Sequence, residues 1–493
     1  MTDPQTIKAL VAKRYAAERR FRFYGAAALV VTAVFLALLV ADLVVKGLPA
    51  LTESRLQMQV MLDPAKIDAA KPAAGDYEGL TRNAVRDMFP SVTARGERKK
   101  LTGLLSSGSG DDLRAMVVAD PALIGKTVTA PVLLSDEADL YLKGLQTGSS
   151  IRKGEGALQI TQNGEAYVLG GAVNGLAKGE IVRVNGGALR IAAVAEAAAE
   201  TETLAAPGSL DAAASGSWSV LSLEKPEGDR TITDQEVVWL EALKEQGAVS
   251  RAFAWRFFLS GDSREPELAG LRGALVGSLL TVAVALLLAL PLGVAAAIYL
   301  EEFAAKNRFT DIIEVNINNL AAVPSIIFGL LGLAMFLNVF GMPRSAPLAG
   351  GLVLALLVLP TIIIASRAAL KAVPPSIKEA ALGVGASHQQ AVFHHVVPLA
   401  LPGIMTGTIL GLARAFGETA PLLMIGMVAF IVDIPGSFTD AATVLPVQVF
   451  LWSDLPEAAF QSKTAAAILV LMAVLFCLNA VAILLRKRFE RRW

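Results

Sequence analysis

Two residues of opposite charge lie close together in one of the most apolar parts of the sequence. Arg414 and Glu418 stand four residues apart and are followed by Thr419, in the run Arg-Ala-Phe-Gly-Glu-Thr-Ala-Pro-Leu. Ionisable residues at membrane depth are costly and usually functional, and residues four apart meet on one helix face. A planar guanidinium matches the oxygens of an oxyanion, and a neighbouring glutamate would weaken its hold. The pattern indicates an anion path, with a structural ion pair between two helices as the alternative.

A second informative segment lies between two apolar blocks and runs from Pro374 to Pro398. Pro374 and the proline after it stop the preceding helix. Ser376 and Glu379 have the spacing of a capping box, so a new helix is expected to begin there. Two glycines then interrupt that helix, and a second helical stretch follows. The sequence therefore predicts a helix–bend–helix over residues 374–398.

Four other residues, one arginine and three histidines, need an interpretation. Arg367 stands near the end of an apolar block, where a long basic side chain can reach the membrane interface. The three histidines, His388, His394 and His395, all fall within residues 374–398. They have no cysteine or carboxylate at ligand spacing beside them, so we expect no metal site. We also expect no cofactor.

The apolar blocks predict a membrane protein. The chain has 493 residues, 54% of them hydrophobic, and a net charge of +0 that gives no reason to expect nucleic acid as a partner. About 20 apolar residues cross a bilayer as a helix. On that measure six spans are predicted, at roughly 23–45, 273–300, 319–340, 347–370, 401–430 and 465–485. The first is too long for a signal peptide and is expected to remain as an anchor.

Basic residues at the chain ends predict the orientation of the spans. Arginines and lysines crowd both terminal segments, and such clusters favour the cytoplasm. Six spans agree with two cytoplasmic termini in a multi-pass protein of the inner membrane. The expected organisation is a cytoplasmic tail (1–22), a first transmembrane helix (23–45), a periplasmic insert (46–270), a core with helices two to six (271–485) and a basic tail (486–493).

The insert has the composition of a soluble domain. Residues 181–191 alternate around Asn185-Gly186 and predict a hairpin, as do residues 158–161 before Asn163-Gly164. A short helix is expected at 136–145 and a helical return to the membrane at 234–258. Residues 195–216 are expected to be a loose connection. These elements predict a small α+β domain.

The helix–bend–helix at 374–398 resembles the EAA loop of ABC importer permeases, and we call it the coupling loop. The residues that match are Glu379, Ala380, Ala381, Gly385 and Pro398, whereas the position three before the proline is a histidine instead of an apolar residue. The resemblance implies that this loop docks in a cytoplasmic ATPase. The chain has no phosphate-binding P-loop of its own and no nucleophile–base or metal constellation, so we expect a transport subunit and not an enzyme.

The Gly-Glu-Thr-Ala-Pro run after Arg414 resembles the fifth span of Pst-type phosphate permeases, and the resemblance to their A subunits covers about 265–493. It implies an all-α, six-helix type I ABC importer core with the periplasmic α+β insert added. It also implies a substrate path along Arg414, Glu418, Thr419 and Arg367. The implied partners are a second permease, two ATPase subunits, a periplasmic phosphate-binding protein and membrane lipid.

Two rival functions remain open. The chain could be a permease for another oxyanion, because selectivity resides mostly in the binding protein. It could instead be a membrane-anchored sensor whose residues 47–270 bind a ligand. The second rival explains the insert but not the five further spans or the coupling loop.

Overall fold

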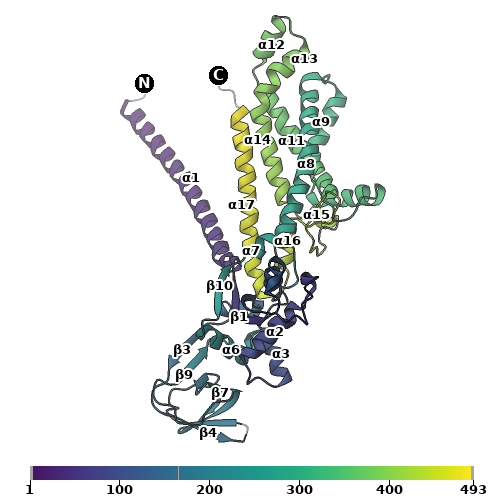
Figure 1. The fold of residues 1–493 in the computed structure, drawn as a ribbon. Coiled ribbons are helices and arrows are strands. Elements are labelled where there is room, and N and C mark those ends of the chain that lie inside the picture. Colours follow the sequence, from purple (N-terminus) through teal and green to yellow (C-terminus); the bar gives the residue numbers. More distant parts are fainter. Residues whose placement is uncertain (1–3, 165, 490–493) are drawn as a thin grey trace. The chain divides into compact units, whose positions relative to one another are not determined.

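The computed structural model describes residues 4–164 and 166–489, which form two compact units (Figure 1). The helical unit contains the residues up to Ala50, Phe257–Ser263 and the residues from Gly270 onwards. The insert unit contains Leu51–Arg256 and Arg264–Ala269. Parts of the two expected tails, residues 1–3 and 490–493, lie outside the described residues. Arg491 and Arg492 are among them.

The helical unit is built from long apolar helices. Its elements are α1 (Pro4–Gly47), α8 (Arg272–Ile298), α9 (Arg308–Ala321), α10 (Ser325–Gly332), α11 (Pro347–Lys371), α12 (Pro375–Gly383), α13 (His388–Ala391), α14 (Val397–Gly417), α15 (Ala420–Met424), α16 (Leu445–Ser453) and α17 (Ala458–Phe489). The short α7 (Trp255–Leu259) spans the point in the sequence where the chain enters this unit.

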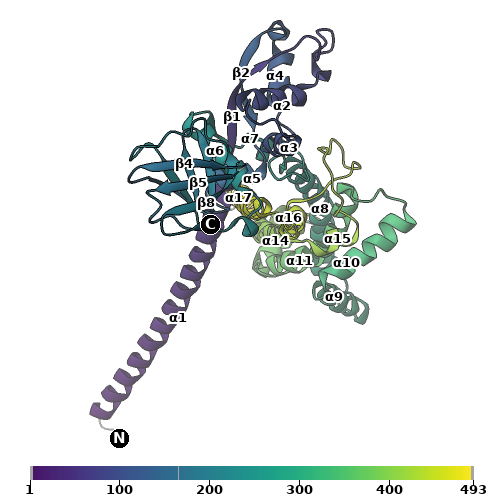
Figure 2. The same cartoon turned by 90° about the horizontal axis from the view of Figure 1, so that it is seen from below.

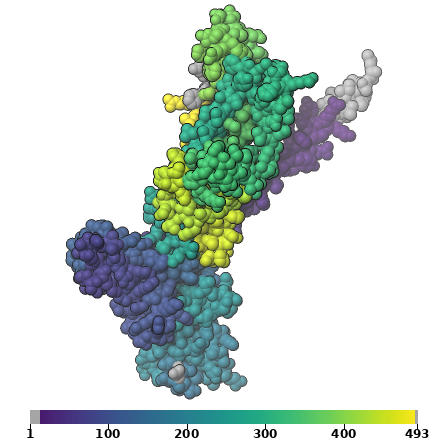
Figure 3. All heavy atoms as spheres, turned by 90° about the vertical axis from the view of Figure 1, so that its right-hand side faces the viewer, coloured from purple at the N-terminus to yellow at the C-terminus, as the bar shows by residue number. Residues whose placement is uncertain are grey.

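Five helices in the described part of the chain are long and apolar enough to cross a membrane, and six if one bent pair counts as a span. The bent pair, α9 followed by α10, turns by 100° between Ala321 and Ser325. The predicted straight span at 319–340 is therefore wrong, because Pro324 cannot continue α9 and begins a new helix instead. In Figure 2, α10 projects from the side of the bundle. Figure 3 looks at that side, so the green surface of this region faces the viewer.

The fifth predicted span also ends earlier than expected. Helix α14 stops at Gly417, and Glu418 adopts an extended conformation before the short α15 begins. The sequence had predicted one continuous helix over residues 401–430. Glycine at the helix end and proline in the first turn of the next helix explain the break.

Small residues bring α8, α11 and α14 close together. A Cβ added to Gly351 of α11 would lie 2.4 Å from Val284 of α8, and one added to Gly407 of α14 would lie 2.2 Å from Ala365 of α11. Glycine is required at such contacts because any side chain would collide. Helix α1 approaches α17 at Gly47, whose added Cβ would lie 2.9 Å from the backbone of Ala466.

The insert unit contains two antiparallel sheets and several helices. The smaller sheet has the order β10-β1-β2, and the larger has the order β3-β9-β6-β7-β8-β5-β4. Their strands are β1 (Thr52–Met61), β2 (Thr127–Leu133), β3 (Ser149–Lys153), β4 (Leu158–Asn163), β5 (Ala166–Gly171), β6 (Ile181–Val184), β7 (Gly187–Val194), β8 (Ala198–Ala205), β9 (Ser219–Leu223) and β10 (Val249–Phe253). The helices are α2 (Tyr77–Met88), α3 (Arg95–Gly103), α4 (Asp111–Ala119), α5 (Asp136–Leu142) and α6 (Asp234–Glu245).

Both predicted hairpins are confirmed. Strands β6 and β7 pair across Asn185 and Gly186, whose φ angles of 50° and 76° suit a two-residue turn. Strands β4 and β5 pair around Gly164. The segment 195–216 was wrongly expected to be a loose connection, because β8 forms there and pairs with β7 and β5.

Candidate functional site

The Arg414–Glu418 pair lies where α14 ends. Nε of Arg414 is 3.7 Å from Oε1 of Glu418, and their side chains are 40% and 21% exposed. Both residues belong to the same helix end, so this pair does not join two helices. A pair this exposed contributes at most about 1 kcal/mol to stability. A role in helix packing therefore explains the position of this ion pair poorly.

Neighbouring residues show which way this helix end faces. Ala415 and Phe416 are buried, at 3% and 2% exposure, and Ala415 belongs to the apolar core shared by α8, α11 and α16. Arg414 is exposed on the other side of the helix. The guanidinium thus points away from the core of its own chain, on a face that is free to line a path.

Thr419 occupies the break between the two helices. Its carbonyl oxygen accepts hydrogen bonds from the backbone N–H groups of Leu422 and Leu423, both at 3.0 Å, and so starts α15. The following turn packs against α10, because a Cβ on Gly329 would lie 2.7 Å from Pro421. The bent α9–α10 pair therefore supports the interrupted helix that carries Arg414.

Arg367 has a different environment. Its Nε lies 3.4 Å from a carboxylate oxygen of Glu301, its Nη2 pairs with Glu314 of α9, and the side chain is 13% exposed. The two carboxylates neutralise this arginine and tie three elements together.

The two arginines lie at different heights along the α11–α14 contact. Gly403 faces Ala369 and Gly407 faces Ala365, so Arg367 is level with the stretch between those glycines. Arg414 is about nine residues further along α14, or roughly 14 Å at the rise of an α-helix. The structure does not bring these two cations together at one site.

The coupling loop forms the expected helix–bend–helix, with one correction. Helix α12 begins with Pro375 after an N-cap at Pro374 that makes no side-chain hydrogen bond, so the capping box predicted for Ser376 and Glu379 is wrong. Proline already supplies the φ angle and lacks the N–H that a cap would satisfy. A capping box does form eleven residues later, between Ser387 and Gln390, and starts α13.

The residues that match the EAA pattern differ in exposure. Glu379 and Ala380 are exposed, whereas Ala381 is buried against the body of the loop. Gly385 has a φ angle of +92°, which other residues rarely adopt, and it makes the bend between α12 and α13. Pro398 lies in the first turn of α14. Figure 1 places α12 and α13 at one end of the bundle, beyond α11 and α14.

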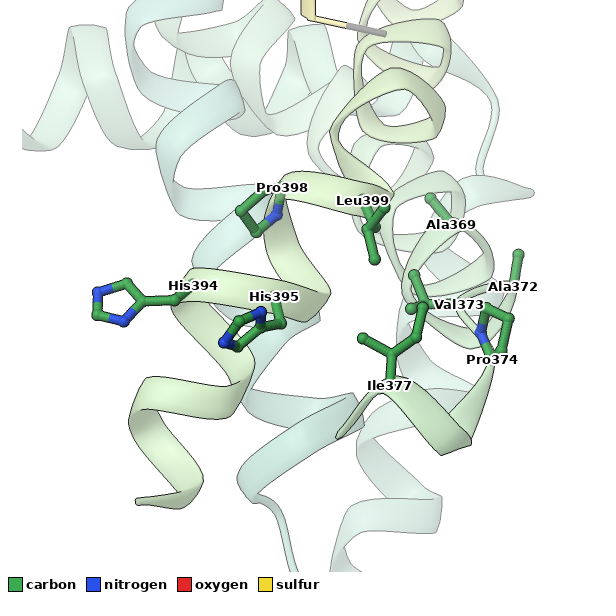
Figure 4. Close-up of a pocket in the computed structure, with 9 residues that line it drawn as sticks. All are labelled: Ala369, Ala372, Val373, Pro374, Ile377, His394, His395, Pro398 and Leu399. Atoms are coloured by element: carbon green, nitrogen blue, oxygen red, sulfur yellow. The ribbon is translucent and has the colours of Figure 1, made fainter. Parts of the chain in front are cut away.

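An apolar groove of about 590 Å³ lies beside the coupling loop (Figure 4). Its walls come from the end of α11, the start of α12 and the π-helical turn Val392–Val396 that precedes α14. In the close-up, His394 points away from Ile377 on the opposite wall. Among the described residues, no three histidine, cysteine or acidic side chains are grouped closely enough to hold a metal ion.

Sequence reasoning missed a set of ion pairs at this end of the bundle. Glu301 and Glu302 lie in the π-helical turn Tyr299–Phe303 after α8, where they meet Arg367, Lys371 and Lys378. The sequence offered one signal for these ion pairs. Adjacent acidic residues stand at the end of one span, and basic residues stand at the end of another span whose expected orientation places them on the same side of the membrane.

Two family models match the chain. The binding-protein-dependent transport system inner membrane component matches residues 289–493, and a domain of unknown function, DUF3333, matches residues 8–151. Residues 152–288 lie between the two matches, so most strands of the larger sheet are covered by neither.

Curated relatives are permeases. The phosphate transport system permease protein PstA 1 of Mycobacterium tuberculosis is 31% identical over 256 residues, which are 52% of this chain and 83% of the relative. The probable ABC transporter permease protein YqgI of Bacillus subtilis is 30% identical over 46% of this chain and 82% of its own. PstC of Haemophilus influenzae is 30% identical over 43% of this chain and 73% of its own.

A solved structure of the MetNI methionine ABC transporter, facing inward, matches 45% of this chain and 96% of its own at 18% identity. Its TM-score of 0.35 is too low to bear on the fold. The relatives and the membrane-length helices make the chain a multi-pass inner-membrane transport component. The chain therefore belongs to the family of binding-protein-dependent inner-membrane permeases and is a homologue of the PstA permease proteins.

Proposed function

We propose that this chain is one of two permease subunits of an ATP-driven importer of inorganic phosphate. The observation that carries the proposal is the exposure of Arg414. Its side chain points away from the core of this chain, at the end of an interrupted membrane helix. The chain is also a homologue of phosphate permeases. An unburied arginine in a membrane-length helix needs an aqueous or anionic neighbour. A phosphate path shared with a second, similar permease supplies both.

The proposed membrane topology has six spans. The α9–α10 pair counts as the third span. Helix α10 and the π-helical turn after it (Leu333–Val339) are too short to cross a bilayer alone, because their 15 residues reach roughly 22 Å. Both termini and the coupling loop then lie in the cytoplasm, and the insert unit lies in the periplasm. The basic residues at the ends of α1 and α17 support this orientation.

In this arrangement each candidate residue has a role. Arg414 contacts the passing anion, while Glu418 and Thr419 limit how tightly it is held. Arg367 is a second cation on the path, and its carboxylate partners reduce its hold on phosphate. Glu379, Ala380, Ala381, Gly385 and Pro398 shape the surface that docks in the ATPase. Two ATPase subunits supply the energy, and a periplasmic binding protein delivers phosphate.

Uptake of labelled phosphate into vesicles tests the proposal. The vesicles contain this chain, its partner permease, the ATPase and the binding protein. Replacing Arg414 with Gln removes a charged hydrogen-bond donor and is expected to lower uptake about tenfold or more. ATP hydrolysis by the complex should persist, because the coupling loop is unchanged. The control is Arg308→Gln, an exposed arginine at the start of α9.

The outcomes separate the rival functions. Unchanged uptake by Arg414→Gln would remove this residue from the path. Entry of another oxyanion in place of phosphate would leave the permease class standing and change the substrate. A complex through which nothing passes would favour the sensor, whose ligand would have to bind the insert unit.

A further inference from the structure

Glu302 contacts both helices of the coupling loop. Its carboxylate accepts a hydrogen bond from Nζ of Lys378 in α12 at 2.6 Å. Its backbone oxygen lies 2.8 Å from Nε2 of His388 in α13. Because a carbonyl oxygen can only accept, Nε2 must carry the proton of this bond. One residue at the end of α8 therefore holds α12 and α13 at the same time.

The residues on either side of Glu302 strengthen this attachment. The ring of Phe303 meets the imidazole of His388 edge to face, with centroids 5.0 Å apart. Leu300 is buried in the apolar cluster that contains Val392 and Val396 of the π-helical turn before α14. The turn Tyr299–Phe303 thus combines a charged, a polar and an apolar contact with the coupling loop.

Glu301 fastens the same turn to the rest of the helical unit. Its carboxylate lies 3.4 Å from Arg367 and 3.6 Å from Lys371, both in α11. Arg367 also pairs with Glu314 of α9. Adjacent glutamates therefore face different partners: Glu301 holds the turn to the core, and Glu302 holds the coupling loop to the turn.

Helices α12 and α13 have few other anchors. Of residues 375–391, all of which the structure describes, Ala381 and Ala391 alone are buried. Leu382 and Val384 are 41% and 87% exposed. Two alanines bury little apolar surface, so packing alone holds α12 and α13 weakly. The contacts of Glu302 and Phe303 should consequently govern how the loop is positioned.

We propose that Glu302 and Phe303 form a clamp that makes the coupling loop move as one body with the inner ends of α8 and α11. A displacement of α12 by the ATPase would then be transmitted through Lys378 and Glu302 to α8, and through Glu301 to α11. Glu302 is a positioning residue in this scheme. The inference rests on the proposed function for the identity of the ATPase partner, although the clamp itself is a property of this chain.

Hydrogen exchange tests the clamp without any transport. The full complex is compared with a complex that carries Glu302→Gln, which keeps the backbone oxygen bound to His388 and removes the carboxylate charge. We expect the amides of α12 to exchange roughly two- to fivefold faster, the range for loss of one partly exposed ion pair. Lys306→Met, an exposed lysine just after the turn, is the matched control and should leave exchange unchanged.

A second measurement separates positioning from simple support. The number of ATP molecules consumed per phosphate imported should rise by a similar factor in Glu302→Gln and in Lys378→Met. The exchanged pair, Glu302→Lys with Lys378→Glu, should restore both the exchange rate and the ratio, because it rebuilds the same contact with reversed charges.

Three results would overturn the clamp. They are unchanged exchange in Glu302→Gln, faster exchange with an unchanged ATP-to-phosphate ratio, and an exchanged pair that restores neither quantity. Failure of the proposed function would look different. A wild-type complex that imports no phosphate removes the substrate assignment, while the exchange of α12 amides still decides whether the clamp exists.

Discussion

The two arginines of the membrane helices show how neighbours decide what a charged side chain can do. Arg367 is 13% exposed between two carboxylates, whereas Arg414 has one glutamate at 3.7 Å and is 40% exposed. A paired, shielded guanidinium chiefly joins elements, and an open one can exchange its partner for a passing anion. On the proposed path, Arg367 would therefore hold an anion less strongly than Arg414, whose guanidinium is more open.

The importance of Arg414 could be inferred from a local sequence pattern. Arg414 and Glu418 are four residues apart, and such a pair can be recognised from spacing alone. Glu302 and Lys378 are separated by 76 residues, so only the folded chain brings them together. In the sequence, His388 is one member of a histidine cluster. Its hydrogen bond to the backbone of Glu302 likewise forms only when the chain folds, because the two residues are far apart in the sequence.

Asp136 at the start of α5 leads to a prediction about pH. Burial raises the pKa of Asp136 to about 8, and a hydrogen bond with Glu137 and the charges of Glu137 and Glu267 add to the effect. The pKa in the folded chain lies above the ordinary value of 3.8. The contribution of Asp136 to the stability of the insert unit is therefore fully present below pH 3.8, and it is lost as the pH rises through about 8.

Replacing Asp136 with Asn removes the titrating group and keeps its shape. The melting temperature of the purified chain should differ little from that of the wild type near pH 4, and the variant should gain an increasing advantage up to about pH 8 and a constant one above it. The control is Asp87→Asn, an exposed residue of α2. A constant difference between variant and wild type across this pH range would contradict the prediction.

At the level of elements, the sequence predicted most helices but not their interruptions. The spans at 273–300 and 347–370 agree with α8 and α11 because hydrophobic length is a strong signal. The bend before α10 and the end of α14 were missed, since both stretches stay apolar while proline or glycine breaks the backbone hydrogen bonding. Strand β8 was missed because its alanines and glutamates suit a surface loop equally well.

The α11–α14 contact gives a prediction about helix packing. An added Cβ on Gly407 would lie 2.2 Å from the Cβ of Ala365, which is closer than two carbons can approach. Gly407→Ala should therefore force the helices apart and cost about 1–3 kcal/mol, the usual range for overpacking. The expected readout is a lower melting temperature of the chain in detergent.

The partner residue supplies the decisive comparison. Adding Ala365→Gly to Gly407→Ala removes the colliding carbon and should recover most of the lost stability. Gly25→Ala in α1, where an added Cβ meets nothing within 4 Å, controls for the general effect of alanine in a helix. If the double variant is no more stable than Gly407→Ala, the two residues do not oppose each other.

At the scale of the whole molecule, the two units have separate cores. The apolar clusters of the insert unit draw their buried residues from between Leu56 and Leu243. The two large clusters of the helical unit draw theirs from between Ala285 and Val447. Removing one unit therefore takes no buried side chain out of these clusters of the other.

The ends of the insert also lie next to each other. Thr52 pairs with Phe253 across β1 and β10, and the N–H of Ala254 donates to the oxygen of Leu51 at 2.9 Å. Paired residues in an antiparallel sheet have Cα atoms about 5 Å apart. A linker of about four glycines and serines can therefore replace residues 53–252 without straining the flanking chain.

We expect this shortened chain to assemble with the ATPase and to import phosphate within about twofold of the wild-type rate, as loss of a self-contained inserted domain allows. Co-purification of the ATPase shows whether assembly has survived, and phosphate uptake is then measured on the assembled complex. If the assembled complex no longer imports phosphate, the insert takes part in transport. If phosphate import by the full-length complex is itself absent and a ligand binds the insert, the chain is a sensor. Retained uptake instead places transport in the helical unit, where Arg414 and the coupling loop lie.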